Sequence, residues 1–238
     1  MNQPTRGLHQ QIVDILGQRI VRGDHAPGSS LYPDRLEQEL QVSKTVLREA
    51  LRVLASKGLI DSRQKRGTFV RPRSDWNLLD GDLLRWQGQG IPDTGFLDNL
   101  AEVRGIVEPA GARLAALRRD DDDLAALVEA LERMAAAGND TEAMVEADLA
   151  FHRSLLAAAH NELLIRMEVV LEAGLRVRDH LVHGANGWAD SIPAHDAIIA
   201  AVRSQDPDAA ERAAHALLDQ AGADLRNVLK NRPPEETG

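Results

Sequence analysis

The chain has 238 residues, of which 43% are apolar and none is cysteine. It can therefore bury a hydrophobic core but form no disulfide, and it has no apolar run long enough to span a bilayer. The net charge of −9 hides a division, because residues 1–73 carry +6 and the remainder carries −15. A basic head on an acidic body favours a DNA-binding domain joined to a domain that phosphate repels. The first twenty residues are amphipathic and unlike a secretory signal, so we expect a cytoplasmic protein with no membrane segment.

Three helices and a hairpin are predicted in the first seventy residues. Apolar residues at intervals of three and four predict a helix over 8–21, and a short second helix is expected over 34–40. Ser43 is a good N-cap for a third helix that continues to Gly58. Two helices joined by a tight turn are typical of a helix-turn-helix. The segments 59–62 and 68–71 flank the basic run 63–67, which predicts a β-hairpin with a basic tip.

The third helix carries candidate DNA contacts on the face opposite its apolar residues. Arginine on such a helix can recognise guanine edges in the major groove, while threonine and lysine hold phosphate. An ordinary solvated helix face is the alternative. The basic hairpin tip favours DNA, because it can reach a neighbouring minor groove. The candidates on the helix and at the tip are Lys44, Thr45, Arg48, Arg52, Arg66 and Gly67.

Beyond Pro72 the sequence is rich in alanine and reads as helical almost throughout. Glycine, asparagine and proline mark the breaks between the segments, and a helical bundle is the economical fold. The fold class is therefore mainly α, with an N-terminal winged helix-turn-helix over 1–73, a linker over 74–81, an all-helical domain over 82–230 and a disordered tail over 231–238. The helices are expected over 80–89, 95–118, 121–137, 140–159, 161–182, 190–204 and 207–230.

One spacing in the helical domain points to a metal. Asp148 and His152 are four residues apart and point to the same side of a helix. His195 begins a later helix whose apolar residues would turn it toward the core. Carboxylate and imidazole donors from two helices suit a divalent metal such as Zn²⁺, Mn²⁺ or Ni²⁺ with positions left for a ligand. The alternative is a surface hydrogen bond, the usual role of an isolated pair of this kind.

The N-terminal motifs carry a resemblance. The run PGSSLYPDRLEQELQVSKTVLREALRVLASKGLI, followed by RGTFV, resembles the winged helix-turn-helix of the GntR family of bacterial regulators over residues 8–72. The resemblance implies that Lys44, Thr45 and Arg48 contact operator DNA and that Gly67 lies in the wing. The segment between Leu31 and Val42 is one residue shorter than is usual in the family. The contact that the family makes near Arg35 is therefore in doubt.

The C-terminal motifs resemble the FCD ligand-binding domain of the FadR subfamily. The stretches EVRGIVEPAGARLAA, EADLAFHRSLLAAAHNELL and PAHDAIIAAVRSQDPDAAERAA carry this resemblance. It implies a divalent metal held by Asp148, His152 and His195, and a carboxylate effector bound by Arg104. Many members have a fourth ligand, a histidine on the last helix, where this chain has Leu217. His215 lies two residues away, about 200° around the helix, so it should face elsewhere.

A narrower resemblance concerns the segment DWNLLDGDLLRW, residues 75–86. Together with the missing histidine, it is similar to the branch of galactonate-responsive repressors, which implies a sugar-acid effector such as an aldonate. The same resemblance makes Arg176 a second candidate for effector binding. The alternative is that Arg176 is a surface arginine beside Arg178.

These features predict a homodimeric repressor that binds double-stranded operator DNA and is released by a small carboxylate. A regulator that senses another carboxylic acid, such as a hydroxy acid or an acyl compound, is the alternative within this class. From another class, the metal could serve a hydrolase or lyase. That activity needs a general base near the metal, which the sequence does not supply, and it leaves the basic head unexplained. We therefore expect no enzyme activity.

Overall fold

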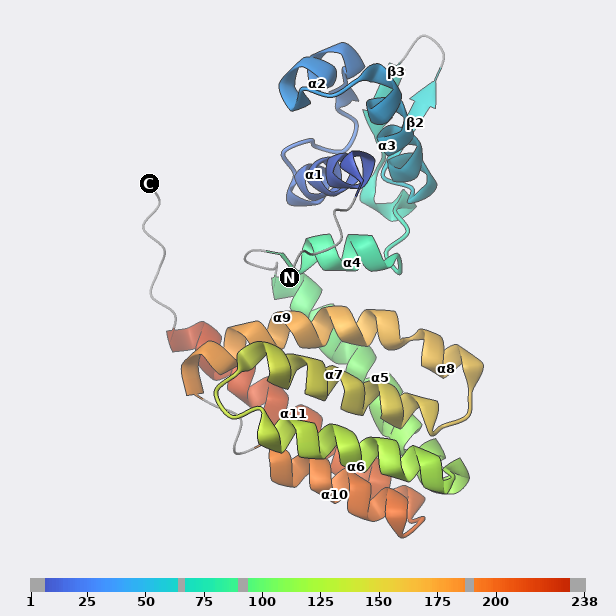
Figure 1. Cartoon of the computed structure of the whole chain (residues 1–238), viewed down its shortest axis with the longest axis vertical. Coiled ribbons are helices and arrows are strands. Elements are labelled where there is room, and N and C mark those ends of the chain that lie inside the picture. The colour runs from blue at the N-terminus through green and yellow to red at the C-terminus, as the bar shows by residue number, and fades with distance from the viewer. Residues whose placement is uncertain (1–6, 64–66, 90–93, 187–190, 232–238) are drawn as a thin grey trace. The chain divides into compact units, whose positions relative to one another are not determined.

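The computed structural model describes residues 7–63, 67–89, 94–186 and 191–231. These residues form eleven α-helices and three short strands (Figure 1). The chain divides into two compact units, residues 1–91 and 92–238, which we describe one at a time. No helix among the described residues is long and apolar enough to cross a membrane.

The described residues of the first unit form four α-helices and a small sheet. Each helix contributes one apolar face to a shared core, in which Leu16, Leu47 and Leu54 are fully buried. Ser43 caps the third helix by accepting a hydrogen bond from the amide of Val46 at 3.4 Å, as its position predicts. The helices of this unit are α1 (Leu8–Arg22), α2 (Pro33–Leu40), α3 (Lys44–Ser56) and α4 (Gly81–Gln87), with a 3₁₀ turn over Arg73–Asp75.

The sheet has the antiparallel order β1-β3-β2. Strand β2 (Ile60–Arg63) pairs with β3 (Gly67–Val70) so that Arg63 faces Gly67, and β1 (Ser30–Leu31) adds to the other edge of β3. The hairpin was predicted, whereas β1 was not, because two residues are too few to show an alternating pattern. The helix-turn-helix and its wing are confirmed. Residues 64–66, including Arg66, lie outside the described residues.

Helix α4 packs with the first unit. Trp86 is buried, and its ring lies against Gly17 of α1, where an added Cβ would approach the ring to 2.4 Å. The indole nitrogen donates a hydrogen bond to Asp14 at 3.0 Å. This differs from the expected linker over 74–81 and effector domain from residue 82. The apolar pair Leu83 and Trp86 needs a partner face, and α1 supplies it.

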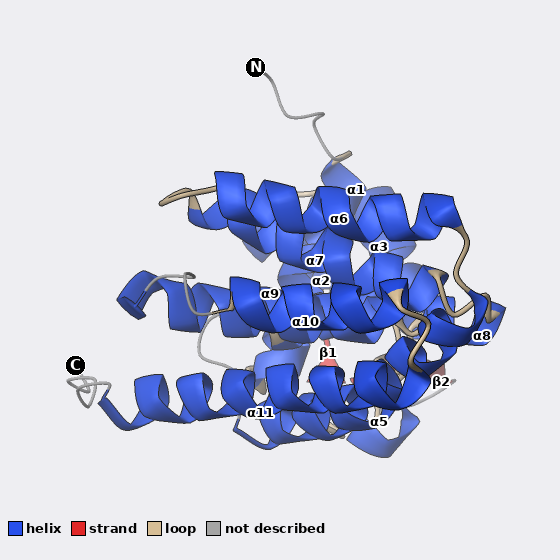
Figure 2. Cartoon of the chain, turned by 90° about the horizontal axis from the view of Figure 1, so that it is seen from below, coloured by secondary structure: helices blue, strands red, loops and turns tan. Residues whose placement is uncertain are grey.

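The second unit is a bundle with α5 at its centre, because α5 contacts α7, α9, α10 and α11. Figure 2 shows α6, α10 and α11 running side by side along the bundle. The prediction of an all-helical domain is confirmed. Its helices are α5 (Thr94–Arg118), α6 (Asp121–Ala136), α7 (Thr141–Ala157), α8 (Glu162–Arg166), α9 (Glu168–Asn186), α10 (Ile192–Arg203) and α11 (Pro207–Asn231).

The helix expected over 161–182 is two helices, because the amide of Met167 bonds to Leu164 and not to the residue four back. This 3₁₀-type turn ends α8 without a glycine or proline, so no residue type in the sequence marks it. The tail expected over 231–238 lies outside the described residues except for Asn231, which ends α11.

Candidate functional site

Among the residues that the structure describes, six ionisable side chains are buried inside the second unit. Burial of this kind is unusual, because charged groups are rarely removed from water without a partner or a metal. They come from four different helices that pack on one another, so the bundle itself brings them together. The six are Arg104 and Glu108 from α5, Asp148 and His152 from α7, Arg178 from α9 and His195 from α10.

Asp148, His152 and His195 converge on one point. His195 Nε2 lies 3.1 Å from Asp148 Oδ1, and His152 Nε2 lies 3.7 Å from Asp148 Oδ2. One ligand atom from each residue falls within 4.8 Å of the others. The three side chains predicted from the sequence therefore meet, and none is more than 2% exposed.

The local sequence explains how His195 comes to face this point. Ile198, Ile199 and Val202 are buried on the same side of α10 and turn the helix toward the core. His195 Nδ1 lies 2.8 Å from the carbonyl oxygen of Ser191, which can only accept a hydrogen bond. The proton of a neutral ring is therefore on Nδ1, and the lone pair of Nε2 points toward Asp148.

This arrangement fits a divalent metal. A lone pair facing a carboxylate at 3.1 Å is repulsive unless a cation or a proton lies between them. Among the described residues, neither oxygen of Asp148 receives a hydrogen bond of normal geometry, and His195 Nε2 has no aligned partner. One carboxylate and two imidazoles are a usual ligand set for Zn²⁺ and related ions, and they leave positions open.

Glu108, which sequence reasoning missed, connects this group to Arg104. Its Oε1 accepts from Arg104 Nε at 2.5 Å and its Oε2 lies 3.4 Å from Nη2 of the same guanidinium. The same Oε2 lies 2.8 Å from His152 Nδ1. A sequence signal was available, because Arg104 and Glu108 are four residues apart on the stripe of α5 that also buries Leu100.

The electrostatics of the cluster keep both carboxyls ionised. Burial alone would raise the pKa of Glu108, but Arg104 and His152 outweigh it and lower that pKa to about 2. Burial also opposes ionisation of Asp148, but His152 and His195 in their protonated forms, together with Arg178, hold the pKa of this carboxyl well below its usual range. An ionised Asp148 is the form that a metal binds.

Arg176, for which both an effector contact and a surface position were considered, lies at the surface, whereas Arg178 is buried. Arg176 is 34% exposed, and it pairs with Glu146 at 2.6 Å and with Glu172 at 3.2 Å on the outside of α7 and α9. It does not join the buried cluster, whereas Arg178 is buried and acts electrostatically on Asp148. The spacing of Arg178 from the buried Leu175 could have identified it as inward-facing.

The last helix supplies no fourth imidazole from the two positions considered. Leu217 is buried in the apolar core, and His215 is exposed, as the helical period predicts. The protein ligands available from the described cluster are therefore Asp148, His152 and His195.

A second group of possible ligands lies on the surface, where His160 Nε2 is 2.7 Å from Asp123 Oδ2. Asp120 and Asp123 form a capping box at the start of α6, and each carboxylate accepts the backbone amide of the other residue. The acidic run is therefore a helix start, as its position predicted.

The first unit presents the candidate DNA contacts to solvent. Lys44, Thr45, Arg48 and Arg52 are exposed on α3, opposite the buried Leu47. With Asp34 of α2 and Ser62 and Thr68 of the wing, Lys44, Arg48 and Arg52 line a shallow groove. Arg52 pairs with Glu49 at 2.8 Å within the helix, and Arg35 is exposed on α2.

Arg63 and Gly67 form the last described pair of the wing, next to residues 64–66. Gly67 has φ +76°, a left-handed conformation that other residues rarely adopt, although a Cβ there would meet nothing within 4 Å. Glycine is therefore required at this position by the backbone and not by crowding. Arg63 lies over the ring of the buried Phe69 at 5.5 Å and pairs with Asp61.

A winged helix-turn-helix joined to an all-helical domain is the architecture of a transcription regulator. Comparison with known families agrees. Residues 8–70 match the bacterial regulatory proteins of the gntR family, and residues 99–220 match the FCD domain. The chain belongs to the GntR family of transcriptional regulators, in the group with an FCD domain.

Individual relatives sharpen this assignment. The chain is 37% identical to the galactonate operon transcriptional repressor of Escherichia coli K12, over 94% of this chain and 99% of that protein. It is 33% identical to an HTH-type transcriptional regulator of Mycobacterium tuberculosis, over 94% and 92% of the two chains. The solved structure of E. coli McbR/YncC matches with a TM-score of 0.53 at 22% identity, over 94% and 99%, and supports the fold.

Proposed function

We propose that this regulator is a repressor that binds a divalent metal through Asp148, His152 and His195 and is released from its operator by a small sugar acid. The observation that carries the proposal is the buried group of donors around Asp148, whose oxygens have no aligned hydrogen bond among the described residues. When bound, the metal would supply positive charge and open coordination positions for effector oxygens.

The charge balance favours an anionic effector. With neutral imidazoles, the two buried arginines offset the two buried carboxylates, so the six side chains sum to zero. A divalent metal raises this sum to +2 in a region of low dielectric, where an anion is strongly attracted. Arg104 can bind a carboxylate through two parallel N–H groups, and the hydroxyl groups of an aldonate would satisfy further polar atoms.

The effector class also has support from similarity. A protein 37% identical over nearly the whole chain is named as the galactonate operon repressor, which favours an aldonate over an acyl compound. Another carboxylic acid is the second candidate, because the charge argument alone does not select a sugar. The two relatives described above are named as transcriptional regulators, and they give no support to a hydrolase or lyase.

The DNA contacts follow from the exposed face of α3. We assign the major groove to this helix through Lys44, Thr45, Arg48 and Arg52, with the wing from Gly67 reaching the neighbouring groove and Arg35 near the phosphates. Arg66, which lies outside the described residues, completes the set from the sequence. One such helix reads only a few base pairs, so we expect a homodimer on a two-fold related site.

The test combines operator selection with effector titration. The preferred DNA site is first selected from random duplexes, and binding of the full chain is then followed by fluorescence anisotropy. We expect galactonate or a related aldonate to lower the affinity in the presence of Zn²⁺, while galactose, which lacks the carboxylate, has no effect. Unchanged DNA affinity with every aldonate, together with no ligand-induced rise in melting temperature, would overturn the proposal.

A further inference from the structure

We propose that Glu108 is the positioning residue that joins the two halves of the effector site, because its single carboxylate orients both Arg104 and the metal ligand His152. The inference rests on the proposed function and assigns a role to a residue that the sequence motifs did not single out. It is carried by three contacts between buried groups, with Arg104 Nε at 2.5 Å, Arg104 Nη2 at 3.4 Å and His152 Nδ1 at 2.8 Å.

His152 is the metal ligand that lies against Glu108. Glu108 Oε2 lies 2.8 Å from His152 Nδ1 without the alignment of a hydrogen bond, and its negative charge favours the ring form with the proton on that nitrogen. Nε2 is then unprotonated on the side that faces Asp148. A carboxylate behind the distal nitrogen of a ligating histidine fixes the ring orientation and raises its basicity, and removing such a partner typically lowers metal affinity by about 10- to 100-fold.

Arg104 is the other residue that Glu108 contacts. Glu108 holds the edge of the guanidinium formed by Nε and Nη2. An incoming carboxylate would therefore approach the guanidinium from a side other than the edge that Glu108 holds. Glu108 thereby selects which edge of Arg104 meets the effector, and it does so from the same helix four residues away.

Pro109 makes this position on α5 distinctive. It lies inside the helix and has no amide hydrogen, so the carbonyl of Gly105 receives no hydrogen bond from it. The turn that carries Arg104 and Glu108 is thus held by one backbone hydrogen bond fewer, and the ion pair between the two side chains spans that turn.

The decisive variant is Glu108→Gln, which keeps the size of the side chain. An amide has one accepting oxygen, so it cannot serve both Arg104 and His152 as a carboxylate does. We expect the Zn²⁺ dissociation constant, measured by competition with a chromophoric chelator, to rise about 10- to 100-fold. The ¹⁵N signals of the His152 ring, assigned with His152→Ala, should lose the single tautomer protonated on Nδ1.

A double variant separates positioning from simple stability. In Arg104→Met with Glu108→Gln, no buried cation is left unpaired by the change, and the amide oxygen is free to accept from His152. Zn²⁺ affinity should return to within about threefold of wild type, while aldonate binding is lost. Asp208→Asn is the matched control, because Asp208 also pairs with an arginine of α5, Arg113, but on the surface; it should change neither affinity.

The outcomes are distinct. Wild-type protein that binds neither Zn²⁺ nor an aldonate contradicts the proposed function itself. If the wild type binds both and Glu108→Gln keeps wild-type Zn²⁺ affinity and histidine signals, the positioning role is overturned. If Glu108→Gln does not fold, the double variant decides, and weak Zn²⁺ binding by that folded variant overturns the proposal.

Discussion

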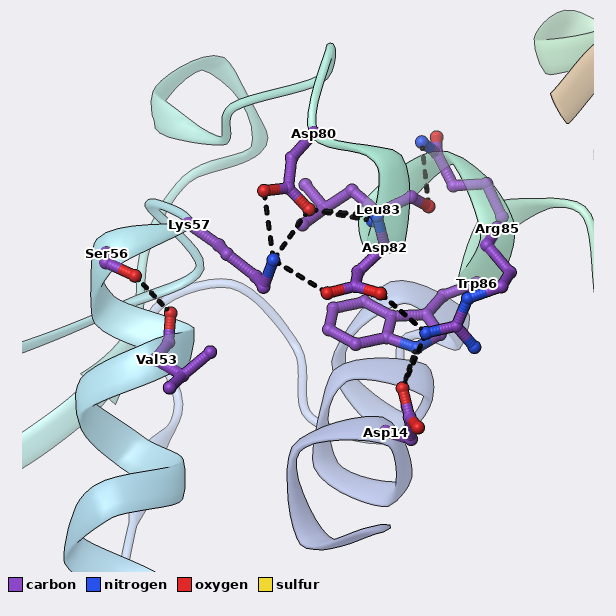
Figure 3. A network of polar contacts seen from close by, with 10 residues as sticks. Asp14, Val53, Ser56, Lys57, Asp80, Asp82, Leu83, Arg85 and Trp86 are labelled. Atoms are coloured by element: carbon purple, nitrogen blue, oxygen red, sulfur yellow. Dashed lines mark hydrogen bonds and ion pairs between the residues drawn. The ribbon is translucent and has the colours of Figure 1, made fainter. Parts of the chain in front are cut away.

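Two networks of charged side chains, one in each unit, show how differently ion pairs are used in this protein. In the first unit, Lys57 lies between Asp80 and Asp82 at 2.9 and 2.8 Å, and Arg85 bridges Asp82 and Asp14 (Figure 3). These side chains are between 13% and 33% exposed. Each charge meets an opposite charge at hydrogen-bonding distance, and the network fastens α4 to α1 and to the end of α3.

The cluster in the second unit has no such internal completion. Asp148 is fully buried, and its two oxygens have no aligned hydrogen bond among the described residues. A buried carboxylate in this condition is costly to the fold unless something else satisfies it. The comparison teaches that a completed, partly exposed network serves packing, whereas a buried, incomplete one indicates a ligand.

The variant with the largest expected effect disrupts the buried cluster around Asp148. Asp148→Asn removes the one carboxylate among the three metal ligands, and we expect Zn²⁺ affinity to fall about a thousandfold, roughly 4 kcal/mol. Chelator competition with protein purified without a metal-affinity tag measures it. His215→Ala is the control, because His215 is an exposed histidine outside the cluster. Equal Zn²⁺ uptake by Asp148→Asn and wild type would remove Asp148 from the site.

The next largest effect is a dependence of stability on pH in the metal-free protein. The pKa of Glu108 is about 2 in the folded state and near 4.5 in the unfolded chain, so its stabilisation is complete above pH 4.5 and is lost as pH falls toward 2. The shift corresponds to roughly 3 kcal/mol of the free energy of unfolding. Urea unfolding of the second unit between pH 7 and pH 3, with chelator present, follows this loss. Glu108→Gln should show a smaller decrease in the free energy of unfolding between pH 7 and pH 3 than wild type. An equal or larger decrease would contradict this prediction.

Only part of the buried cluster could be predicted from the sequence. Asp148, His152 and His195 were found because two of them share a helical turn and the third begins an apolar helix face. Glu108 and Arg178 were missed because a charged residue on a helix is ordinarily solvated, and only packing against other helices shows that it is buried. Arg176 was chosen as an effector-binding candidate by resemblance to a family. Whether it faces the core depends on which face of α9 packs against α7.

The same limit applies to the fold. Helices with long apolar stripes and clear caps were located within a few residues of their observed ends, because local sequence determines both features. The break at Met167 and the two-residue strand β1 carry no local signal. The placement of α4 is a tertiary effect, since Trp86 finds its partner surface at Gly17, about seventy residues away.

A packing change tests that tertiary contact at intermediate magnitude. In Gly17→Ala the new methyl group would lie 2.4 Å from the ring of Trp86, so the ring must move. We expect a net loss of about 2 kcal/mol in the stability of the first unit, even though alanine favours a helix. Thermal unfolding followed by circular dichroism measures it. Gly17→Ala combined with Trp86→Leu should recover much of the loss, and strict additivity would exclude the proposed clash.

The smallest effect comes from the completed network. Lys57→Met removes the central cation but leaves Asp80 able to cap α4, where it accepts from the amides of Asp82 and Leu83. Because the ion pairs of Lys57 are partly exposed, we expect a loss of only about 1 kcal/mol in stability. Salt screens exposed pairs, so the difference between wild type and variant should shrink from 0.05 M to about 1 M NaCl. Urea unfolding at the two salt concentrations measures both quantities.

Zn²⁺ affinity should not change in Lys57→Met, because Lys57 lies in the first unit. A weaker Zn²⁺ affinity in this variant would mean that the two networks do not act independently.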